Sequence, residues 1–271
     1  QQVPIVESVV ERSFVLSVPG NTYKYFADVV AFSGLEKPRV QVQGEVVFVG
    51  YGINAPELKW NDYEGAGVRG KWVMIMVNDP PAPADEPTLF AGNALTYYGR
   101  WTYKFEEAAR QGAAGALLIH TDESATYPWQ VVQSSWTGTQ YSLPPQPGEP
   151  ALGIKAWISN TAAKDLARRG GRDLDLMRAA ASKRGFKAIS LNTRAAATLM
   201  STEGSLVLRT SFYKLLETQR SQALETDPFF DSLQEVYPYE QLRVMLSKTL
   251  DEAVVLEGGF DLRRVDDEDD E

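Results

Sequence analysis

The chain has 271 residues, of which 44% are hydrophobic, so it can bury a substantial core and is not disordered along its whole length. Its formal net charge of −9 is concentrated in residues 251–271, which carry −8 and leave −1 to residues 1–250. Because this body has no basic stripe, we expect no nucleic-acid partner and no electrostatic binding to an anionic membrane surface.

The absence of cysteine excludes disulfides and thiolate metal sites. No apolar run approaches the roughly 18 residues that a membrane-spanning helix requires, so we expect no transmembrane segment. The sequence begins with Gln1 instead of methionine, which fits the removal of a signal peptide upstream.

Up to about residue 50, short alternating apolar stretches separated by turn residues predict antiparallel hairpins. The clearest pair is 14–18 and 23–26, on either side of a Pro-Gly-Asn turn. Two denser apolar runs, 45–49 and 71–77, predict buried central strands.

Residues 80–87 come next and contain four prolines. Because proline cannot lie inside a sheet, we expect this segment to be a loop. The composition of residues 103–111 predicts a helix that stops at Gly112, and residues 116–119 follow as a strand. Residues 127–150 are rich in Pro, Gly, Ser, Gln and Trp, and we expect them to form a long surface excursion.

A second helix is expected to begin at Ser159 or Asn160, either of which is a favourable N-cap, and to stop at Gly170. Three further runs alternate like strands, at residues 186–191, 195–200 and 205–208. Residues 1–210 are therefore predicted to form one α+β unit dominated by strands.

The composition changes after this unit, and residues 212–224 have the pattern of a helix. Residues 239–250 also place apolar side chains at helical spacing, at Leu242, Met245, Leu246 and Leu250. We expect a helical C-terminal extension over 211–257 and a disordered acidic tail over 258–271.

Four blocks of sequence carry a family resemblance. They cover residues 46–57, 60–80, 96–116, and 150–166 with 191–201. With these blocks, residues 1–210 resemble the protease-associated domain of bacterial zinc aminopeptidases related to the transferrin receptor and glutamate carboxypeptidase. The resemblance implies a β-sandwich or open barrel with flanking helices. It also implies a domain without catalytic residues that shapes a substrate cleft or mediates association.

The resemblance ends near Thr210, where a member of that family would enter its catalytic domain. The co-catalytic zinc site of the family uses two histidines with Asp and Glu ligands and a Glu base. This chain has one histidine, His120, in a His-x-Asp pattern with Asp122. Because no second histidine can complete a site, we expect a structural role for His120, no catalytic residue, no cofactor and no bound metal.

Other motifs have a structural interpretation that outweighs a chemical one. Residues 112–115 lack the Lys and Ser or Thr of a phosphate loop, so they predict a helix end and a turn. Adjacent helical residues do not face each other, so Glu106 and Glu107 are expected on a solvated face. The acidic run 266–271 lacks the spacing of a calcium loop and favours a solubilising tail.

Aromatic residues gather in two places. Trp129 and Trp136 fall in the long surface excursion, where partner binding and coverage of the barrel end explain them equally well. Core packing is favoured for the aromatic residues of the third block, Tyr97, Tyr98, Trp101 and Tyr103. An apolar helix face is costly to leave in water, at about 25 cal/mol per Å². The candidate partner-binding residues are therefore Trp129, Trp136, Leu242, Leu246 and Leu250.

Two functions remain open. The first is a non-catalytic protein-interaction module or accessory subunit of a larger assembly, with a protein partner that is either soluble or part of a membrane-bound complex. The second is the non-catalytic portion of a split or processed zinc aminopeptidase whose metal-binding domain is a separate chain. The resemblance and the non-methionine start together predict an extracytoplasmic location, periplasmic or secreted.

Overall fold

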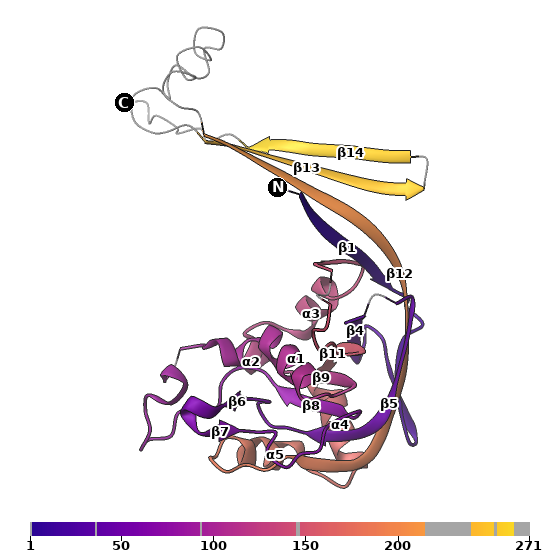
Figure 1. Cartoon of the computed structure of the whole chain (residues 1–271). Helices are drawn as coiled ribbons and strands as arrows, with labels where there is room; N and C mark the ends of the chain where they lie inside the picture. Colours follow the sequence, from indigo (N-terminus) through magenta and orange to yellow (C-terminus); the bar gives the residue numbers. More distant parts are fainter. Residues whose placement is uncertain are drawn as a thin grey trace, which may run out of the picture. The chain divides into compact units, whose positions relative to one another are not determined.

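A computed structural model of the chain describes residues 2–35, 37–92, 94–144, 147–214, 240–251 and 254–262 (Figure 1). The chain divides into two compact units. The larger comprises Ser8–Gln140 and Pro145–Glu203, and the other comprises Gln1–Glu7, Tyr141–Pro144 and Gly204–Glu271. The candidate site described below lies entirely in the larger unit.

A mixed, nearly closed, barrel-like sheet forms the centre of the larger unit. Its parallel strands are neighbours in the order β5 (Arg39–Phe48), β8 (Trp72–Met76), β9 (Gly115–His120) and β11 (Ile154–Ser159). Antiparallel strands continue the sheet on both sides, where β12 (Ile189–Lys214) pairs with β5 and β4 (Val29–Ser33) pairs with β11. The α+β class is confirmed, and the expected open barrel corresponds to this sheet.

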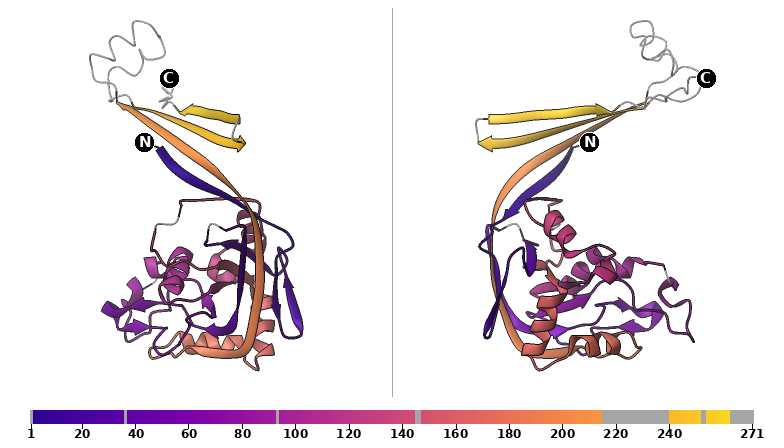
Figure 2. Two further views of the ribbon diagram at one scale, coloured as in Figure 1. Left: turned by 45° about the vertical axis from the view of Figure 1, so that its right-hand side comes forward. Right: turned by 180° about the vertical axis from the view of Figure 1, so that it is seen from behind.

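Shorter strands complete the larger unit. The predicted hairpin is β2 (Val15–Val18) with β3 (Asn21–Lys24), and β2 pairs with β12 at one side of the unit (Figure 2). Asp165 ties this hairpin to helix α4 (Asn160–Arg169), because its carboxylate accepts hydrogen bonds from the Tyr23 hydroxyl at 2.9 Å and the Asn21 amide at 3.0 Å. A second small hairpin joins β6 (Asn54–Ala55) to β7 (Trp60–Asn61).

Helices cover both faces of the sheet. The α-helices besides α4 are α1 (Trp101–Arg110), α2 (Asp122–Ala125), α3 (Trp129–Ser135) and α5 (Leu174–Ala181). Short 3-10 helices are η1 (Pro56–Leu58), η2 (Leu89–Ala91) and η3 (Tyr97–Gly99). Figure 1 shows α1 and α4 on opposite sides of β8 and β9.

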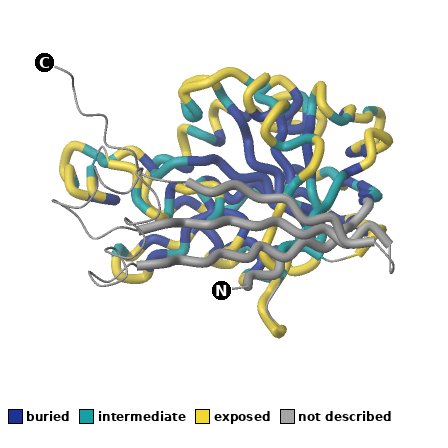
Figure 3. The backbone as a smooth tube through the Cα atoms, turned by 90° about the horizontal axis from the view of Figure 1, so that it is seen from above, coloured by how far each residue is buried: buried dark blue, intermediate teal, exposed yellow. Residues whose placement is uncertain are grey.

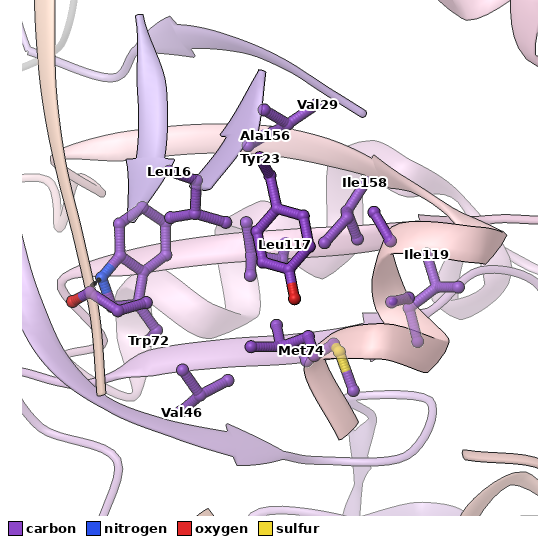
Figure 4. Close-up of a cluster of buried hydrophobic side chains, with 14 of the residues drawn as sticks. Leu16, Tyr23, Val29, Val46, Trp72, Met74, Leu117, Ile119, Ala156 and Ile158 are labelled. Atoms are coloured by element: carbon purple, nitrogen blue, oxygen red, sulfur yellow. Dashed lines mark hydrogen bonds between the residues drawn. The ribbon is translucent and has the colours of Figure 1, made fainter. Parts of the chain in front are cut away.

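Strand β8 is buried on both faces, and its side chains alternate between two hydrophobic clusters. Trp72 and Met74 pack with residues of α4 and α5 in the cluster drawn in part in Figure 4. Val73 and Ile75 pack with Phe105 of α1 and its neighbours. Figure 3 shows the buried residues in dark blue along the strands, with exposed residues in the loops around them. The burial of β8 on both faces explains why its residues form one continuous apolar run in the sequence.

Two predicted helix ends are confirmed. The Ser159 hydroxyl accepts a hydrogen bond from the backbone N–H of Ala162 at 3.3 Å and caps the N-terminus of α4. At the end of α1, Gly112 takes a left-handed φ of 78°, which suits glycine. Its N–H donates to the carbonyl of Ala109 at 2.8 Å, and the N–H of Ala113 donates to the carbonyl of Ala108 at 3.0 Å. This pattern is a Schellman motif, a common helix end.

Three features of the larger unit differ from the sequence prediction. The long surface excursion contains helix α3 and strand β10 (Thr139–Ser142). Helix α5 was missed, although Asp173 caps it by accepting from the N–H groups of Asp175 and Leu176. The three runs predicted as separate strands over 186–191, 195–200 and 205–208 instead fall in one strand, β12, apart from residues 186–188, which precede it; β12 has an irregularity between Ser190 and Arg194.

The second unit corrects the prediction for the C-terminal part of the chain. Residues 239–250 were predicted as a helix, but Glu240–Asp251 form strand β13, which pairs antiparallel with β12 and with β14 (Val254–Leu262). Leu242, Leu246 and Leu250 are spaced by four residues, which fits a two-residue period as well as a helical one, so the spacing was ambiguous.

Two other predictions at this end are affected. Residues 212–214 of the helix predicted over 212–224 belong to β12, and the rest lie outside the described residues. Of the predicted acidic tail, residues 258–262 belong to β14, and 263–271 lie outside the described residues. This unit also contains β1 (Gln2–Val10) in part. Among the residues that the structure describes, no helix is long and apolar enough to span a membrane.

Candidate functional site

A recess of about 630 Å³ lies at the carboxyl ends of β8 and β9. Because these two strands are parallel, the loops that follow them meet at the same edge of the sheet, which is where ligand sites of parallel sheets usually form. Its walls are residues 77–81 after β8, 99–102 at the start of α1, and 124–127 after β9. Gly92, Ala94, Leu95 and Trp157 complete them.

Asn78 joins these walls. Its backbone N–H donates to the carbonyl of Gly99 at 2.9 Å, and its side-chain amide donates to the carbonyl of Ser124 at 2.8 Å. Its φ of 68° is left-handed, a conformation that asparagine tolerates better than most residues. One asparagine therefore fixes the start of α1 and the loop after β9 against the end of β8.

Asp79 holds the segment that leads into α1. Its carboxylate accepts the Thr96 backbone N–H at 2.7 Å and the Thr96 hydroxyl at 2.8 Å. The same hydroxyl accepts the N–H of Tyr98 at 3.2 Å and caps η3. These bonds hold the segment before α1 in place, and so they set the position of Trp101 at the wall of the recess.

Lys104 supports the recess from behind. It is fully buried, and its ammonium group donates to the backbone carbonyl of Asn78 at 3.0 Å. Burial lowers the pKa of Lys104 to about 7, against the opposing influence of the negative charges of Asp62 and Asp79. Lys104 is not among the lining residues, so it positions the wall and does not meet a ligand.

Asp62 is a second buried ionisable residue, and it interacts electrostatically with Lys104. One carboxylate oxygen accepts the Trp60 indole N–H at 2.8 Å, and the other accepts the Ile53 backbone N–H at 3.0 Å. Burial raises the pKa of Asp62 to about 7. Shifts of this kind often mark catalytic groups. Here the bonds of Asp62 hold the hairpin of β6 and β7, and Asp62 lines a separate polar recess of about 230 Å³ with Lys59, Glu64 and Phe186.

Exposed apolar side chains line the main recess. Leu95 is 52% exposed, Trp101 is 43% exposed and Tyr127 is 37% exposed. At its inner end lies Trp157, which is buried and whose indole N–H has no acceptor among the described residues. Core packing was predicted for the aromatic residues from Tyr97 to Tyr103, and this is correct for Tyr103 but wrong for Tyr97 and Trp101, which are exposed.

The two tryptophans that the sequence offered as partner-binding residues are both half-buried. The Trp136 ring centroid lies 5.2 Å from that of Trp101 and 5.7 Å from that of Trp157, so Trp136 supports the recess from the side. The Trp129 indole N–H donates to the carbonyls of Phe26 at 3.2 Å and Ala27 at 3.1 Å. The other candidates, Leu242, Leu246 and Leu250, lie in strand β13 of the other unit.

His120 ends strand β9, as expected, and is buried among aromatic rings. Its ring centroid lies 5.5 Å from that of Trp129 and 5.7 Å from that of Tyr127. Burial lowers the pKa of His120, so the imidazole is neutral at pH 7. Its Nδ1 lies 3.9 Å from a carboxylate oxygen of Asp122. Within the described ranges, no group of three or more His, Asp or Glu residues could hold a metal.

Glu107 corrects another prediction. It is buried, not solvated, and its carboxylate accepts hydrogen bonds at 2.7 Å from the Arg110 guanidinium and from the Gln111 amide. Glu106, its neighbour, is partly exposed, as expected. Sequence reasoning also missed Lys104, although Lys104 lies four residues before Ala108 and thus on the apolar side of α1.

No protein-family model matches the chain, and no curated protein matches it. The likeness to a protease-associated domain therefore stays a prediction that rests on the four sequence blocks.

Proposed function

We propose that this chain is a non-catalytic protein-interaction module that docks a protein partner at the recess beside Trp101. The observation that carries the proposal is the gathering of Leu95, Trp101 and Tyr127 around a single recess while each remains more than a third exposed. Apolar side chains grouped in this way mark an interaction site more often than singly scattered ones do.

The recess suits a protein segment in size and rigidity. A volume of about 630 Å³ accommodates side chains from a short segment of a partner. Asn78 and Lys104 hold the walls in place before binding, which lowers the entropy lost on association. Trp101 and Tyr127 are of the type that dominates binding energy at protein interfaces, because each buries a large flat surface at small entropic cost.

The family resemblance supports the same proposal, because such a domain mediates association without catalytic residues of its own. We further propose that the chain acts as an accessory subunit of a larger assembly outside the cytoplasm. The alternative, the non-catalytic portion of a split zinc aminopeptidase, differs in one observable respect. Its partner would carry the histidines that complete a zinc site.

The test compares partner retention by variants of the full chain. Wild type, Trp101→Ala and Leu176→Ala would each be tagged, produced in the native source and isolated under mild conditions, and the retained proteins identified by mass spectrometry. Leu176 is the matched control, because it is 72% exposed on α5 and does not line the recess.

We expect a defined partner that wild type and Leu176→Ala retain and Trp101→Ala loses. Equal retention by all three proteins would show that the recess is not the docking site. A retained chain with zinc ligands would favour the split-peptidase alternative.

A further inference from the structure

Phe26, in the turn between β3 and β4, combines backbone strain with exposure. Its φ is 72°, in the left-handed region, and its side chain is 51% exposed. Bulky residues adopt this conformation rarely, because Cβ approaches the neighbouring carbonyl oxygen. Such strain persists only where the surroundings impose it, and it often marks a functional position.

The surroundings of Phe26 do impose its conformation. The Phe26 N–H donates to the carbonyl of Val29 at 2.8 Å. Its carbonyl accepts the Gln133 amide at 2.6 Å and the Trp129 indole N–H at 3.2 Å, both from helix α3. The carbonyl of Asp28, in the same turn, accepts the N–H of Ser159 from β11 at 2.9 Å. The turn is therefore fixed from two separate elements.

Phe90 also has a strained backbone, but its role in the folded core explains that strain. It also has a left-handed φ, 48°, but it is 1% exposed and packs in a cluster with Trp60 and Tyr103. Its hydrophobic burial offsets its backbone strain. Phe26 has no comparable burial, so glycine or asparagine would suit its position in the fold better.

We propose that Phe26 is a preformed anchor that inserts into an apolar pocket on the protein partner, with Trp129 and Gln133 as the positioning residues that hold it. This inference rests on the proposed function, because it requires a protein partner. A rigid aromatic anchor loses little conformational freedom on binding, which favours affinity. Val131 of α3, which is 42% exposed, and Tyr127 add apolar surface to the segments beside the turn.

Folding stability provides the first test. Urea unfolding would compare the wild type with Phe26→Gly and Phe26→Ala. Glycine removes the strain together with the ring, whereas alanine removes the ring alone. We expect Phe26→Gly to be at least as stable as the wild type and more stable than Phe26→Ala. A Phe26→Gly variant less stable than the wild type would assign Phe26 to folding and overturn the proposal.

Partner binding provides the second test. We expect Phe26→Gly to weaken binding of the isolated partner at least ten-fold, with Leu176→Ala as the unchanged control. A photoreactive p-benzoylphenylalanine at position 26 should crosslink to that partner, whereas a crosslink to a second copy of this chain would overturn the assignment.

The outcomes also separate this proposal from the proposed function. If Trp101→Ala loses the partner while Phe26→Gly binds it at wild-type affinity, the anchor is refuted and the docking recess stands. If neither variant changes binding, both proposals fail.

Discussion

The ammonium nitrogen of Lys104 lies 3.0 Å from the backbone carbonyl oxygen of Asn78, with Lys104 fully buried and Asn78 on the wall of the recess. Below a pH of about 7, where Lys104 is protonated, this bond has a charged donor and is stronger than one between neutral groups. The bond holds Asn78, whose φ is left-handed, and Asn78 lies on the wall of the recess. It therefore links the buried side of α1 to the geometry of the recess.

The free energy of unfolding should reveal this buried ammonium through its pH dependence. Burial lowers the pKa of Lys104 to about 7, so its contribution to stability is present above about pH 10.5 and is lost as the pH falls through about 7. Relative to Lys104→Met, the wild type should gain about 1.4 kcal/mol per pH unit between pH 8 and 10. Urea unfolding at several pH values measures this. If the unfolding free energies of the two proteins changed with pH in parallel, the claim that Lys104 has a lowered pKa would be wrong.

Asp62 should titrate near neutral pH. Because burial raises its pKa to about 7, its contribution to stability is present below about pH 4 and is lost as the pH rises through about 7. The carboxyl ¹³C resonance of Asp62 in an NMR titration reports the midpoint directly. In Lys104→Met the midpoint should move higher, since the positive charge of Lys104 lowers the pKa of Asp62. A midpoint near 4 in the wild type would contradict the account.

Substitutions of Asn78 should separate its two roles. Asn78→Ala replaces a residue that tolerates a left-handed φ with one that tolerates it less well, and it removes the hydrogen bond to Ser124, for an expected loss of about 2 kcal/mol of unfolding free energy. Asn78→Gly also removes the hydrogen bond, but glycine adopts a left-handed φ readily, so this variant should lose only about 1 kcal/mol. Chemical denaturation measures both. The prediction fails if alanine is tolerated as well as glycine.

Gly115 allows β9 to pass close to Trp72. A β-carbon at Gly115 would lie 2.6 Å from two ring atoms of Trp72, which is itself fully buried. We expect Gly115→Ala to cost about 1–3 kcal/mol of stability through overpacking. Gly138→Ala gives a reference for backbone strain without overpacking, because that position has a left-handed φ of 76° and no neighbour within 4 Å. A cost below about 1 kcal/mol for Gly115→Ala would contradict the close approach.

The sequence predicted those parts of the fold whose signals are local. The apolar runs of β5 and β8, the Ser159 cap and the Gly112 helix end each depend on a few neighbouring residues, and the structure has all of them. Helix α5 carried a comparable local signal in its Asp173 cap and in Leu174, Met177 and Ala181, and sequence reasoning missed it. Strand β13 was mistaken for a helix because its leucines fit two periods.

The candidate recess could not be predicted in this way, because it depends on contacts between distant segments. Asn78 meets Ser124 only because β8 and β9 are parallel neighbours, and Trp157 reaches the same recess from β11. The role of Trp129 also depends on a turn far away in the sequence, at Phe26. Periodicity within one segment contains no information on such pairs.

Hydrogen-exchange mass spectrometry of the isolated partner complex, compared with the free chain, tests docking at the recess most directly. If the partner docks there, amide exchange should slow in residues 77–81, 99–102 and 124–127, which form its walls. Helix α5, which bears the exposed Leu176, should exchange at the same rate in both states. Unchanged exchange in the recess walls, with slowed exchange in α5 or elsewhere, would contradict the proposal.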